Sequence, residues 1–483
     1  MLGAVLYSLR WRRTTKDLPL PPGPPGHWLW GNEVPEKRTF LKYAEWTDKY
    51  GPVYTLRHGR RTIIVIGRND AALEIMEKEG AHTADRPRAV AGGEMISGNM
   101  RLLLIGVGDR FRKLRKALHS QLQPKIVPTY EPLQRLNAKV LVHDILDNPE
   151  AHCEHAKRFS ASVILSLTYG KPSPSHPADP DITLVNLCLL RFGLAVRPGA
   201  HIVEDMPWLK YLPFYGLTLR RYHREELNLF TRQLQGARSD MAAGKAAPSF
   251  SKYLLERQNE LGLSDNETAY LAGSMFGAGS ETTASAIGII IMASACFPEA
   301  QKVVQDELDT MVGPDRLPIF GDWDSLPQIH AFILETFRWR PGTAPGFQHR
   351  VTKDIIYRGY RIPAGTTVLA NHWAIGRDPE LFPDADKFDP QRWLDEKGQI
   401  RQDLKFPNFG FGRRVCPGQP LAMRSLFITT AFILWSFKIS EDPSRPIDTF
   451  ALSEGSFTFP LPFAAKFEPR QSKLREFIAE DEL

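Results

Sequence analysis

The sequence predicts a mainly α-helical protein with small β-sheets, that is, the α+β fold class. Long stretches with helical patterning dominate the chain, and the clearest of them runs from Asp265 to Phe297. Two short stretches, near residues 50–66 and 350–370, carry instead the alternation and the turn residues that are typical of strands. The 483 residues are 42% hydrophobic and 24% charged, an ordinary globular composition with ample material for a core.

The N-terminal residues predict an attachment segment followed by a stiff spacer. Residues 1–18 begin with apolar or small side chains and continue with arginines and a tryptophan, an order typical of the cytoplasmic end of a membrane anchor. The apolar part is shorter than the roughly twenty residues that cross a bilayer, so we expect a short anchor or the remnant of one. Residues 19–30 contain the string PLPPGPPG, which cannot form a helix and predicts a proline-rich hinge.

Two stretches are expected to form β-structure. Residues 53–66 alternate around His58-Gly59 and predict a β-hairpin. Residues 355–369 predict strands that are broken at Arg358-Gly359 and again at Pro363-Ala364-Gly365. Together these stretches would make a smaller β-rich part of the molecule.

The long helix has clear start and stop signals. Ser264 and Glu267 form a capping-box signature at its beginning, and Pro298 marks its end. A helix of that length runs about 50 Å, enough to cross a domain core. Further helices are expected over residues 298–312 and 326–339.

Charge and cysteine content exclude several classes of protein. The net charge is +6, but the basic residues are dispersed and no nucleic-acid motif accompanies them. A basic patch for an acidic protein partner or for anionic lipid fits this charge, and so does a plain solvated surface. The cysteines are scattered, which argues against a disulfide framework or a zinc site and for a reducing compartment. They are Cys153, Cys188, Cys296 and Cys416.

Cys416 lies in the most informative string of the chain, FGFGRRVCPG at residues 409–418. The glycines allow positive φ and a close approach of the backbone to a large flat cofactor. An apolar run after the cysteine predicts a helix whose N-terminus favours a thiolate, and Arg414 can pair with a carboxylate on the cofactor rim. The alternative is an inert buried cysteine in a glycine turn.

The long helix contains a weak turn with the sequence GAGSETT at residues 277–283. Glycine inside a helix costs about 1 kcal/mol relative to alanine, and a threonine can bond back to a carbonyl and bend the helix. Glu281 beside the hydroxyl of Thr282 is a candidate proton relay. Close packing of two helices at small residues explains the same string without chemistry.

Charged residues elsewhere form smaller candidate sets. Glu335 and Arg338 lie three residues apart on one predicted helix face, and Arg392 follows in the string FDPQRW. An exposed surface pair is the simpler interpretation of the first two. Further cations that could hold an anionic cofactor are Arg115, His119 one turn later, and either His349 or Arg350.

These motifs, in this order, resemble those of the cytochrome P-450 (heme-thiolate monooxygenase) family. The matching patterns are F-x-x-G-x-R-x-C-x-G, A-G-x-E-T-T and E-x-x-R, together with a W-x-x-x-R element in which Phe111 replaces the tryptophan. The later Glu and Phe of that family are Gln391 and Trp393 here. The resemblance covers residues 19–470 and implies a triangular helical body with a smaller β-rich N-terminal region, as one catalytic domain over residues 31–483. Residues 357–379 look most like fungal members, which often serve secondary metabolism.

The resemblance also implies roles for single residues. Cys416 would be the axial thiolate ligand of heme b (iron protoporphyrin IX), in a loop that Phe409, Gly410 and Gly418 shape. Heme propionates would be held by Arg414, Arg115, His119 and His349. Thr282 would hydrogen-bond dioxygen and Glu281 would help deliver protons. Glu335, Arg338 and Arg392 would form a buried network beneath the heme loop.

A substrate pocket is implied in the same way, although each of its residues could equally be a plain core residue. Its members would be Met95, Ile96, Met100, Phe276, Ala278, Thr343, Ala344, Ser456 and Phe457. Apolar types dominate, which favours a neutral lipophilic substrate such as a terpenoid, a polyketide or an aromatic metabolite. Residues 202–215 carry several aromatics and could enter a membrane interface or form a covered internal loop.

The expected activity is insertion of one oxygen atom from O2 into that substrate. The chain has no phosphate loop and no convincing dinucleotide fingerprint, so electrons from NADPH would arrive through NADPH–cytochrome P-450 reductase, with cytochrome b5 as a further donor. The resemblance implies a monomer on the endoplasmic reticulum membrane, facing the cytosol, with no nucleic-acid partner. The alternatives are a heme-thiolate isomerase or dehydratase acting on a peroxide, and a non-catalytic heme-binding protein.

Overall fold

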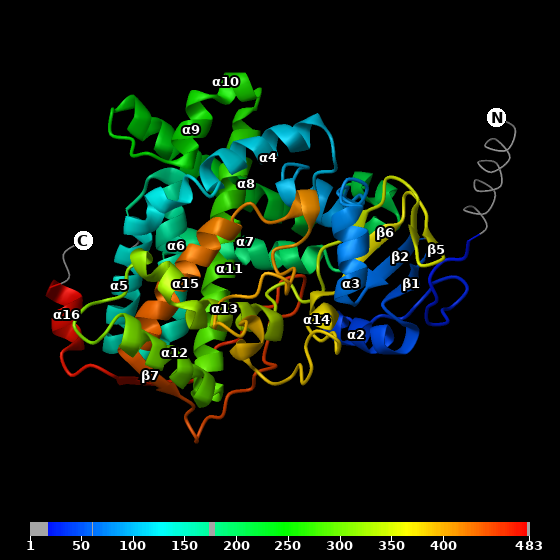
Figure 1. Cartoon of the computed structure of the whole chain (residues 1–483). Helices are drawn as coiled ribbons and strands as arrows, with labels where there is room; N and C mark the ends of the chain where they lie inside the picture. Colours follow the sequence, from blue (N-terminus) through cyan, green and yellow to red (C-terminus); the bar gives the residue numbers. More distant parts are fainter. Residues whose placement is uncertain (1–17, 60, 173–178, 481–483) are drawn as a thin grey trace, which may run out of the picture. The chain divides into compact units, whose positions relative to one another are not determined.

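The computed structural model describes residues 18–59, 61–172 and 179–480, so most of the expected anchor lies outside the described residues. The chain forms two compact units (Figure 1). Within the described residues, unit 1 comprises residues 18–88, 343–385 and 406–416, and unit 2 comprises residues 89–342, 386–405 and 417–480. Each unit draws on separate parts of the sequence, so neither is a simple N-terminal or C-terminal domain.

Unit 1 is built on a four-stranded sheet with the order β1-β2-β6-β3. Its strands are β1 (Val53–His58), β2 (Arg61–Ile66), β6 (Thr367–Ala370) and β3 (His349–Arg350). The expected hairpin is confirmed, because β1 and β2 pair antiparallel with Val53 opposite Ile66. Strand β6 then pairs parallel to β2. The β-rich region is therefore only partly N-terminal, since residues 343–385 complete its sheet.

The other expected strands form a separate sheet in unit 1. They are β4 (Ile355–Tyr357) and β5 (Tyr360–Ile362), which pair antiparallel across the predicted break at Arg358-Gly359. The helical segments of this unit are α2 (Thr39–Tyr50), α3 (Asn69–Ala72), η1 (Leu73–Lys78), α14 (His372–Ile375) and η10 (Gly412–Arg414).

Both faces of the main sheet are covered. Successive side chains of a strand point to opposite faces, so Ile64 and Ile66 enter one buried cluster while Ile63 and Val65 enter another. Tyr43 and Trp46 of α2 complete the second cluster.

The proline-rich stretch is attached to this sheet. The carbonyl of Pro22 accepts a hydrogen bond from the Thr55 amide (2.7 Å), and that of Pro19 accepts one from the Arg361 amide (2.9 Å). At Gly23 an added Cβ would lie 2.0 Å from the carbonyl oxygen of Thr55, so only glycine fits. The sequence predicted a spacer as far as residue 30, whereas the chain is bonded to unit 1 from Pro19 onward.

Unit 2 is helical, with one small sheet of β7 (Phe437–Ser440) and β8 (Lys466–Pro469). Its α-helices are α4 (Asp109–Leu122), α5 (Glu131–Asp147), α6 (His152–Tyr169), α7 (Pro180–Ala195), α8 (Leu217–Ala242), α9 (Phe250–Glu256), α10 (Gln258–Leu261), α11 (Asp265–Cys296), α12 (Pro298–Met311), α13 (Pro327–Trp339), α15 (Gln419–Ser436) and α16 (Leu474–Glu480). Its short π- and 3₁₀-helices are η2 (Val90–Ile96), η3 (Leu102–Leu104), η4 (Val127–Tyr130), η5 (Pro149–Ala151), η6 (Ile202–Glu204), η7 (Pro207–Tyr211), η8 (Phe320–Ser325) and η9 (Pro390–Trp393).

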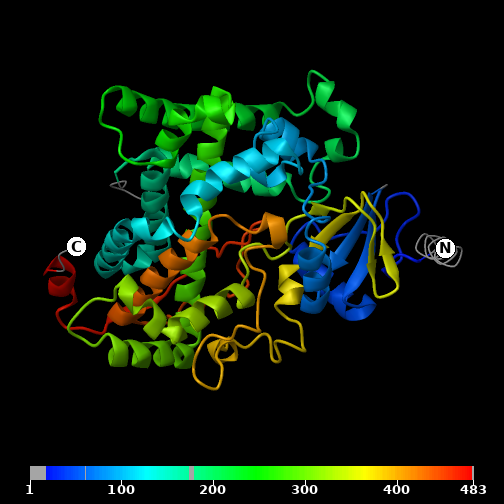
Figure 2. The same ribbon diagram turned by 45° about the horizontal axis from the view of Figure 1, so that its top comes forward.

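Helix α11 is the axis of unit 2. It packs against α6, α7, α8 and α15, and it lies among these helices in both ribbon views (Figures 1 and 2). The predicted capping box is confirmed, with Ser264 Oγ accepting from the Glu267 amide at 3.2 Å. Among the described residues, α11 is the one helix long and apolar enough to cross a membrane. Because 67% of that stretch is buried within unit 2, core packing explains its composition.

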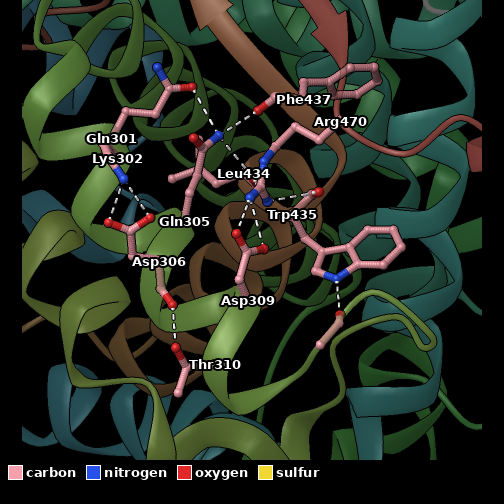
Figure 3. Close-up of polar contacts among 11 residues, drawn as sticks. Gln301, Lys302, Gln305, Asp306, Asp309, Thr310, Leu434, Trp435, Phe437 and Arg470 are labelled. Atoms are coloured by element: carbon pink, nitrogen blue, oxygen red, sulfur yellow. Dashed lines mark hydrogen bonds and ion pairs between the residues drawn. The ribbon is translucent and has the colours of Figure 1, made fainter.

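Two glutamine side chains join α12 to the point where α15 ends and β7 begins (Figure 3). Gln305 donates to the carbonyl oxygens of Leu434 (3.2 Å) and Phe437 (2.9 Å). Gln301 donates to the Ile439 carbonyl (2.8 Å) and accepts from its amide (2.7 Å). These buried amides satisfy main-chain groups that the change from helix to strand would leave without partners.

Candidate active site

The cysteine loop of unit 1 is a tight turn that leaves the thiol exposed. The Cys416 amide donates to the carbonyl of Phe409 at 2.8 Å, which closes the loop on itself. Gly410 and Gly412 have φ values of 83° and 47°, a region that favours glycine. Gly418 does not need this freedom, because its φ is −85°, and it lies directly before α15. Cys416 is exposed, so the interpretation as an inert buried cysteine is wrong.

Cationic side chains gather beside each other in unit 1. Arg414 donates from Nε to the Ala84 carbonyl at 2.6 Å. Burial, together with the charge of Arg414, lowers the pKa of Arg86 to about 9. His349 is buried and donates from Nδ1 to the Thr83 carbonyl at 2.7 Å. Burial and the charge of Arg86 lower the pKa of His349 well below its usual value. Arg86 and Arg414 therefore lie close together, and the Asp85 carboxylate offsets part of the effect on Arg86.

Arg86 was not predicted from the sequence. Its place follows from a bridge between strands, in which the Arg350 amide donates to the Asp85 carbonyl at 2.8 Å. Arg350, considered as an alternative to His349, also donates from Nε to the Asp85 carboxylate at 2.6 Å. The single sequence signal at this position is an arginine before Pro87, which many surface loops share.

The remaining predicted cations lie in unit 2. Arg115 is partly buried on α4, and His119 is exposed one turn later. Phe111, in the position where the family has a tryptophan, is buried in the first turn of the same helix.

The weak turn of α11 carries both a packing feature and a chemical one. A Cβ at Gly279 would lie 2.6 Å from Ile164 of α6, so glycine is needed there for close packing of the two helices. Ala278 and Thr282, however, are exposed on a helix that is otherwise largely buried. The Thr282 hydroxyl donates to the Ala278 carbonyl at 2.6 Å. The hydroxyl oxygen therefore remains available as an acceptor on the exposed face.

Glu281 lies in a different environment from its neighbour Thr282. Its Oε2 atom is buried and has no hydrogen-bond partner within the part of the chain that the structure describes. Burial raises the pKa of Glu281, and the ammonium of Lys157 on α6 opposes that shift in part. This carboxyl group is therefore able to hold a proton above the pH at which an exposed glutamate would lose it.

The structure brings Glu335, Arg338 and Arg392 together inside unit 2. Glu335 and Arg338 are both fully buried, so they are not an exposed surface pair. Arg338 binds the carboxylate with two nitrogens, at 2.8 Å and 2.7 Å, and Arg392 donates from Nε at 3.2 Å. Trp393 adds its indole N–H at 2.9 Å. The family's phenylalanine has no such donor, so this departure strengthens the network.

The predicted pocket residues fall into two groups. Those with buried side chains are Met95, Ile96, Phe276, Ala344 and Ser456. Met95 and Ile96 belong to a core cluster with Val203 and Leu219, and Phe276 packs edge-on against Tyr169. Those with exposed or partly exposed surface are Met100, Ala278, Thr343 and Phe457.

Comparison with known proteins decides the family. A family model described as Cytochrome P450 matches residues 21–467. The chain belongs to the cytochrome P450 family. The mainly helical fold with small sheets agrees with that assignment.

Proteins similar to this P450 include fungal enzymes. Cytochrome P450 monooxygenase 64 of Postia placenta is 52% identical over 473 residues, covering 98% of this chain and 96% of the relative. Cytochrome P450 monooxygenase fogE of Aspergillus ruber is 35% identical over an alignment of 506 residues, covering 100% of this chain and 93% of that relative. The protein is thus an oxidoreductase of the P450 monooxygenase type.

The residues present fit the heme that the family implies. A tight turn presents an exposed thiol, and Arg86 and Arg414 lie close together in the same unit. In unit 2 an exposed strip of α11 interrupts an otherwise buried helix. The thiol and the arginines of unit 1 are residue types that would hold heme through a thiolate ligand and through the heme carboxylates.

Proposed function

We propose that the protein is a heme-thiolate monooxygenase that inserts one oxygen atom from O2 into a neutral lipophilic molecule. The observation that carries the proposal is the contrast between adjacent residues of α11: Thr282 exposes a hydroxyl while Glu281 buries a carboxyl group with a raised pKa. An acid that retains its proton beside an exposed hydroxyl suits a reaction that consumes protons. A heme isomerase or a heme store has no need of such a pair.

The proposed cofactor is heme b, with Cys416 as its axial ligand. Phe409, Gly410 and Gly418 would shape the ligand loop. Bound heme supplies the chemistry of O2 activation, which an electron-donating thiolate favours. Arg414 and His349 of unit 1 and Arg115 and His119 of unit 2 are proposed to hold the propionates, and we propose Arg86 as a further member because of its closeness to Arg414. A carboxylate beside Arg86 would offset the repulsion from Arg414 and raise the pKa of both Arg86 and His349.

Thr282 and Glu281 are proposed to handle protons. The Thr282 hydrogen is engaged by the Ala278 carbonyl, so its oxygen can accept a hydrogen bond from the reacting side. Glu281 holds a proton on its buried carboxyl group. It can release that proton toward Thr282 when its side chain changes orientation. Glu335, Arg338 and Arg392 take no part in this transfer and are proposed to hold the fold that carries it.

The proposed substrate class is a terpenoid, polyketide or aromatic secondary metabolite. The exposed or partly exposed members of the predicted pocket, Met100, Ala278 and Phe457, are apolar, and Thr343 adds one hydroxyl. Burial of hydrocarbon against such a surface is favourable, and the surface offers no counter-charge to an ionic substrate.

Membrane association and an external electron supply complete the proposal. Between α7 and α8 large apolar side chains are exposed, including Phe214 (88%), Tyr211 (76%) and Trp208 (58%). An exposed aromatic segment of this kind favours the membrane-interface interpretation over a covered loop. We propose a monomer on the endoplasmic reticulum surface, with residues 1–18 as anchor and residues 19–30 as its connection to the catalytic domain. NADPH–cytochrome P450 reductase, with cytochrome b5 as a further donor, would supply the electrons.

Four measurements test the function. The reduced carbon monoxide spectrum should show thiolate ligation, and a Soret band typical of histidine ligation would overturn the heme assignment. Purified protein with reductase is then screened against lipophilic metabolites by changes in the heme spectrum. With a substrate in hand, Thr282→Ala should lower the product formed per NADPH oxidised. Turnover of a hydroperoxide without reductase or NADPH, and no turnover with them, would instead favour the isomerase.

A further inference from the structure

A buried ion pair joins two distant parts of unit 2. Arg101 pairs with Glu226 of α8, although the two are 125 residues apart in sequence. Their exposed fractions are only 7% and 2%. The second carboxylate oxygen of Glu226 accepts a hydrogen bond from Tyr270 of α11, which is fully buried. One carboxylate therefore ties the segment after η2 to two of the principal helices.

The same group of side chains holds the main chain just before Arg101. Arg101 donates from Nε to the Ser97 hydroxyl (3.3 Å), which in turn donates to the Gly92 carbonyl (2.7 Å). His223 of α8 donates from Nδ1 to the Ile96 carbonyl (2.7 Å). Arg101 also lies 4.1 Å from the ring centre of Phe192 on α7. The segment from η2 to Arg101 is thus bonded to α8 and packed on α7.

The backbone of this segment needs such support. Gly98 and Asn99 both have positive φ, 52° and 58°, in a region that ordinary side chains avoid. A Cβ at Gly98 would lie 2.9 Å from Cε1 of His223, so the turn and α8 approach closely. A turn of this kind persists only where its surroundings impose it.

Stability alone does not explain why charges are used here. Removing two charges from water is costly, and well-packed apolar residues in their place are often as stable or more so. What a buried ion pair can provide is one defined arrangement of the segments that it joins. The segment in question contains Met95, Ile96 and Met100, which the family resemblance places beside the substrate.

We propose that Arg101, Glu226 and Tyr270 form a latch that fixes residues 90–101 and so sets how tightly and selectively the enzyme binds a lipophilic substrate. The inference rests on the proposed function. The three residues are positioning residues, because they act through the segment and not on the reacting atoms.

The test compares Glu226→Gln with Glu225→Gln in the heme-loaded enzyme. Glu225 is the adjacent residue on α8 and pairs with Arg191 at 2.5 Å, but it is partly exposed, which makes it a matched control. Loss of the buried charge should speed amide hydrogen exchange in residues 90–101 about tenfold, since it removes hydrogen bonds to charged groups. Glu225→Gln should leave that exchange unchanged.

Two heme ligands of different size provide the second readout. Imidazole needs little of the pocket wall, whereas 4-phenylimidazole places an apolar ring against it. In Glu226→Gln the dissociation constant of 4-phenylimidazole should rise about tenfold, with that of imidazole nearly constant. Unchanged exchange together with an unchanged ratio of the two constants overturns the latch. The carbon monoxide spectrum of the same samples separates a failure of the proposed function from a failure of the latch. Loss of the thiolate band contradicts the proposed function. A retained thiolate band, with exchange and ligand binding unchanged, contradicts only the latch.

Two further variants cover a failure of Glu226→Gln to fold. Replacing Arg101→Met and Glu226→Leu together removes both charges and should restore folding. The latch predicts faster exchange in residues 90–101 even then, and wild-type exchange overturns it. Tyr270→Phe deletes a single hydroxyl and should shift both readouts in the same direction by a smaller factor; an effect confined to global stability contradicts the proposal.

Discussion

Glu335 and Glu281 are two glutamates on helices of unit 2 whose surroundings could hardly differ more. Glu335 on α13 is surrounded by donors: two nitrogens of Arg338, Nε of Arg392, the Trp393 indole and the Asp389 amide. Glu281 on α11 has a buried oxygen without a hydrogen-bond partner among the described residues, and its pKa is raised by burial. The same residue type is thus used once to anchor and once, we propose, to carry a proton.

The difference follows from what compensates burial. A carboxylate that accepts several hydrogen bonds from cations keeps its charge, and the bonds hold the segments that donate them. A carboxyl group without donors lowers its energy by remaining protonated, which leaves a proton available for transfer. Burial alone therefore says little about role, and the list of donors separates the two.

The largest effect is expected from removing the carboxylate of Glu335, which accepts hydrogen bonds from two arginines. Glu335→Ala leaves two buried arginines without their counter-charge and should cost about 3–5 kcal/mol of unfolding free energy. Little heme-loaded protein should accumulate, as measured by thermal unfolding and by heme content. Glu299→Ala, at the exposed start of α12, is the control and should remain close to wild type. A well-folded Glu335→Ala enzyme would show that Glu335 does not anchor the fold.

Glu281→Gln should lower activity without lowering stability, the reverse of what is expected for Glu335→Ala. The amide cannot release a proton as the acid does, so the rate of product formation should fall about 10²-fold, a typical loss for a general acid. Unfolding temperature should not fall, because the group is already neutral when protonated. Assay with reductase and NADPH alongside thermal unfolding checks both statements. Equal activity in the two enzymes would leave Glu281 without a role in proton transfer.

The sequence predicted the members of this comparison unequally well. Glu335 and Arg338 lie one helical turn apart, so local spacing alone indicates that they can meet, and Arg392 came from the family resemblance. The exposure of Thr282 and the burial of Glu281 depend on which helices cover α11, and no local pattern contains that information. The capping box at Ser264, the hairpin of residues 53–66 and the breaks at 358–359 and 363–365 were predictable because each depends on adjacent residues.

What the sequence could not predict is long-range. Strand β6 pairs with β2 across some three hundred residues of chain, and no local pattern predicts that pairing or its parallel direction. The position of Arg86 depends on the bridge between Asp85 and Arg350. The partner of Arg101 is Glu226, which lies on α8. In each case the residue types are common, and only the tertiary fold distinguishes them from solvated charges.

Trp393→Phe tests a single hydrogen bond to Glu335, the anchoring glutamate. It restores the residue usual in the family but deletes the indole N–H that donates to Glu335 at 2.9 Å. A hydrogen bond to a charged group contributes roughly 1.5–3 kcal/mol, so unfolding free energy should fall by about that amount with the thiolate spectrum intact. Trp28→Phe is the control, because Trp28 is 76% exposed. No loss of stability would mean that the two arginines already saturate the carboxylate.

The smallest effect is a pH dependence that tests the charge of Glu281 directly. Its pKa is raised in the folded protein, so folding favours the protonated form. The associated stability is fully present below the usual pKa of a glutamate and is lost as the pH rises through the folded-state value. Glu281→Gln has no proton to lose, so its unfolding temperature should exceed that of wild type by a margin that increases as the pH rises from the usual glutamate pKa to the folded-state value and is constant above it. A margin that does not change with pH would mean that folding does not favour the protonated form of Glu281, and the assignment of opposite roles to the two glutamates would lose its physical basis.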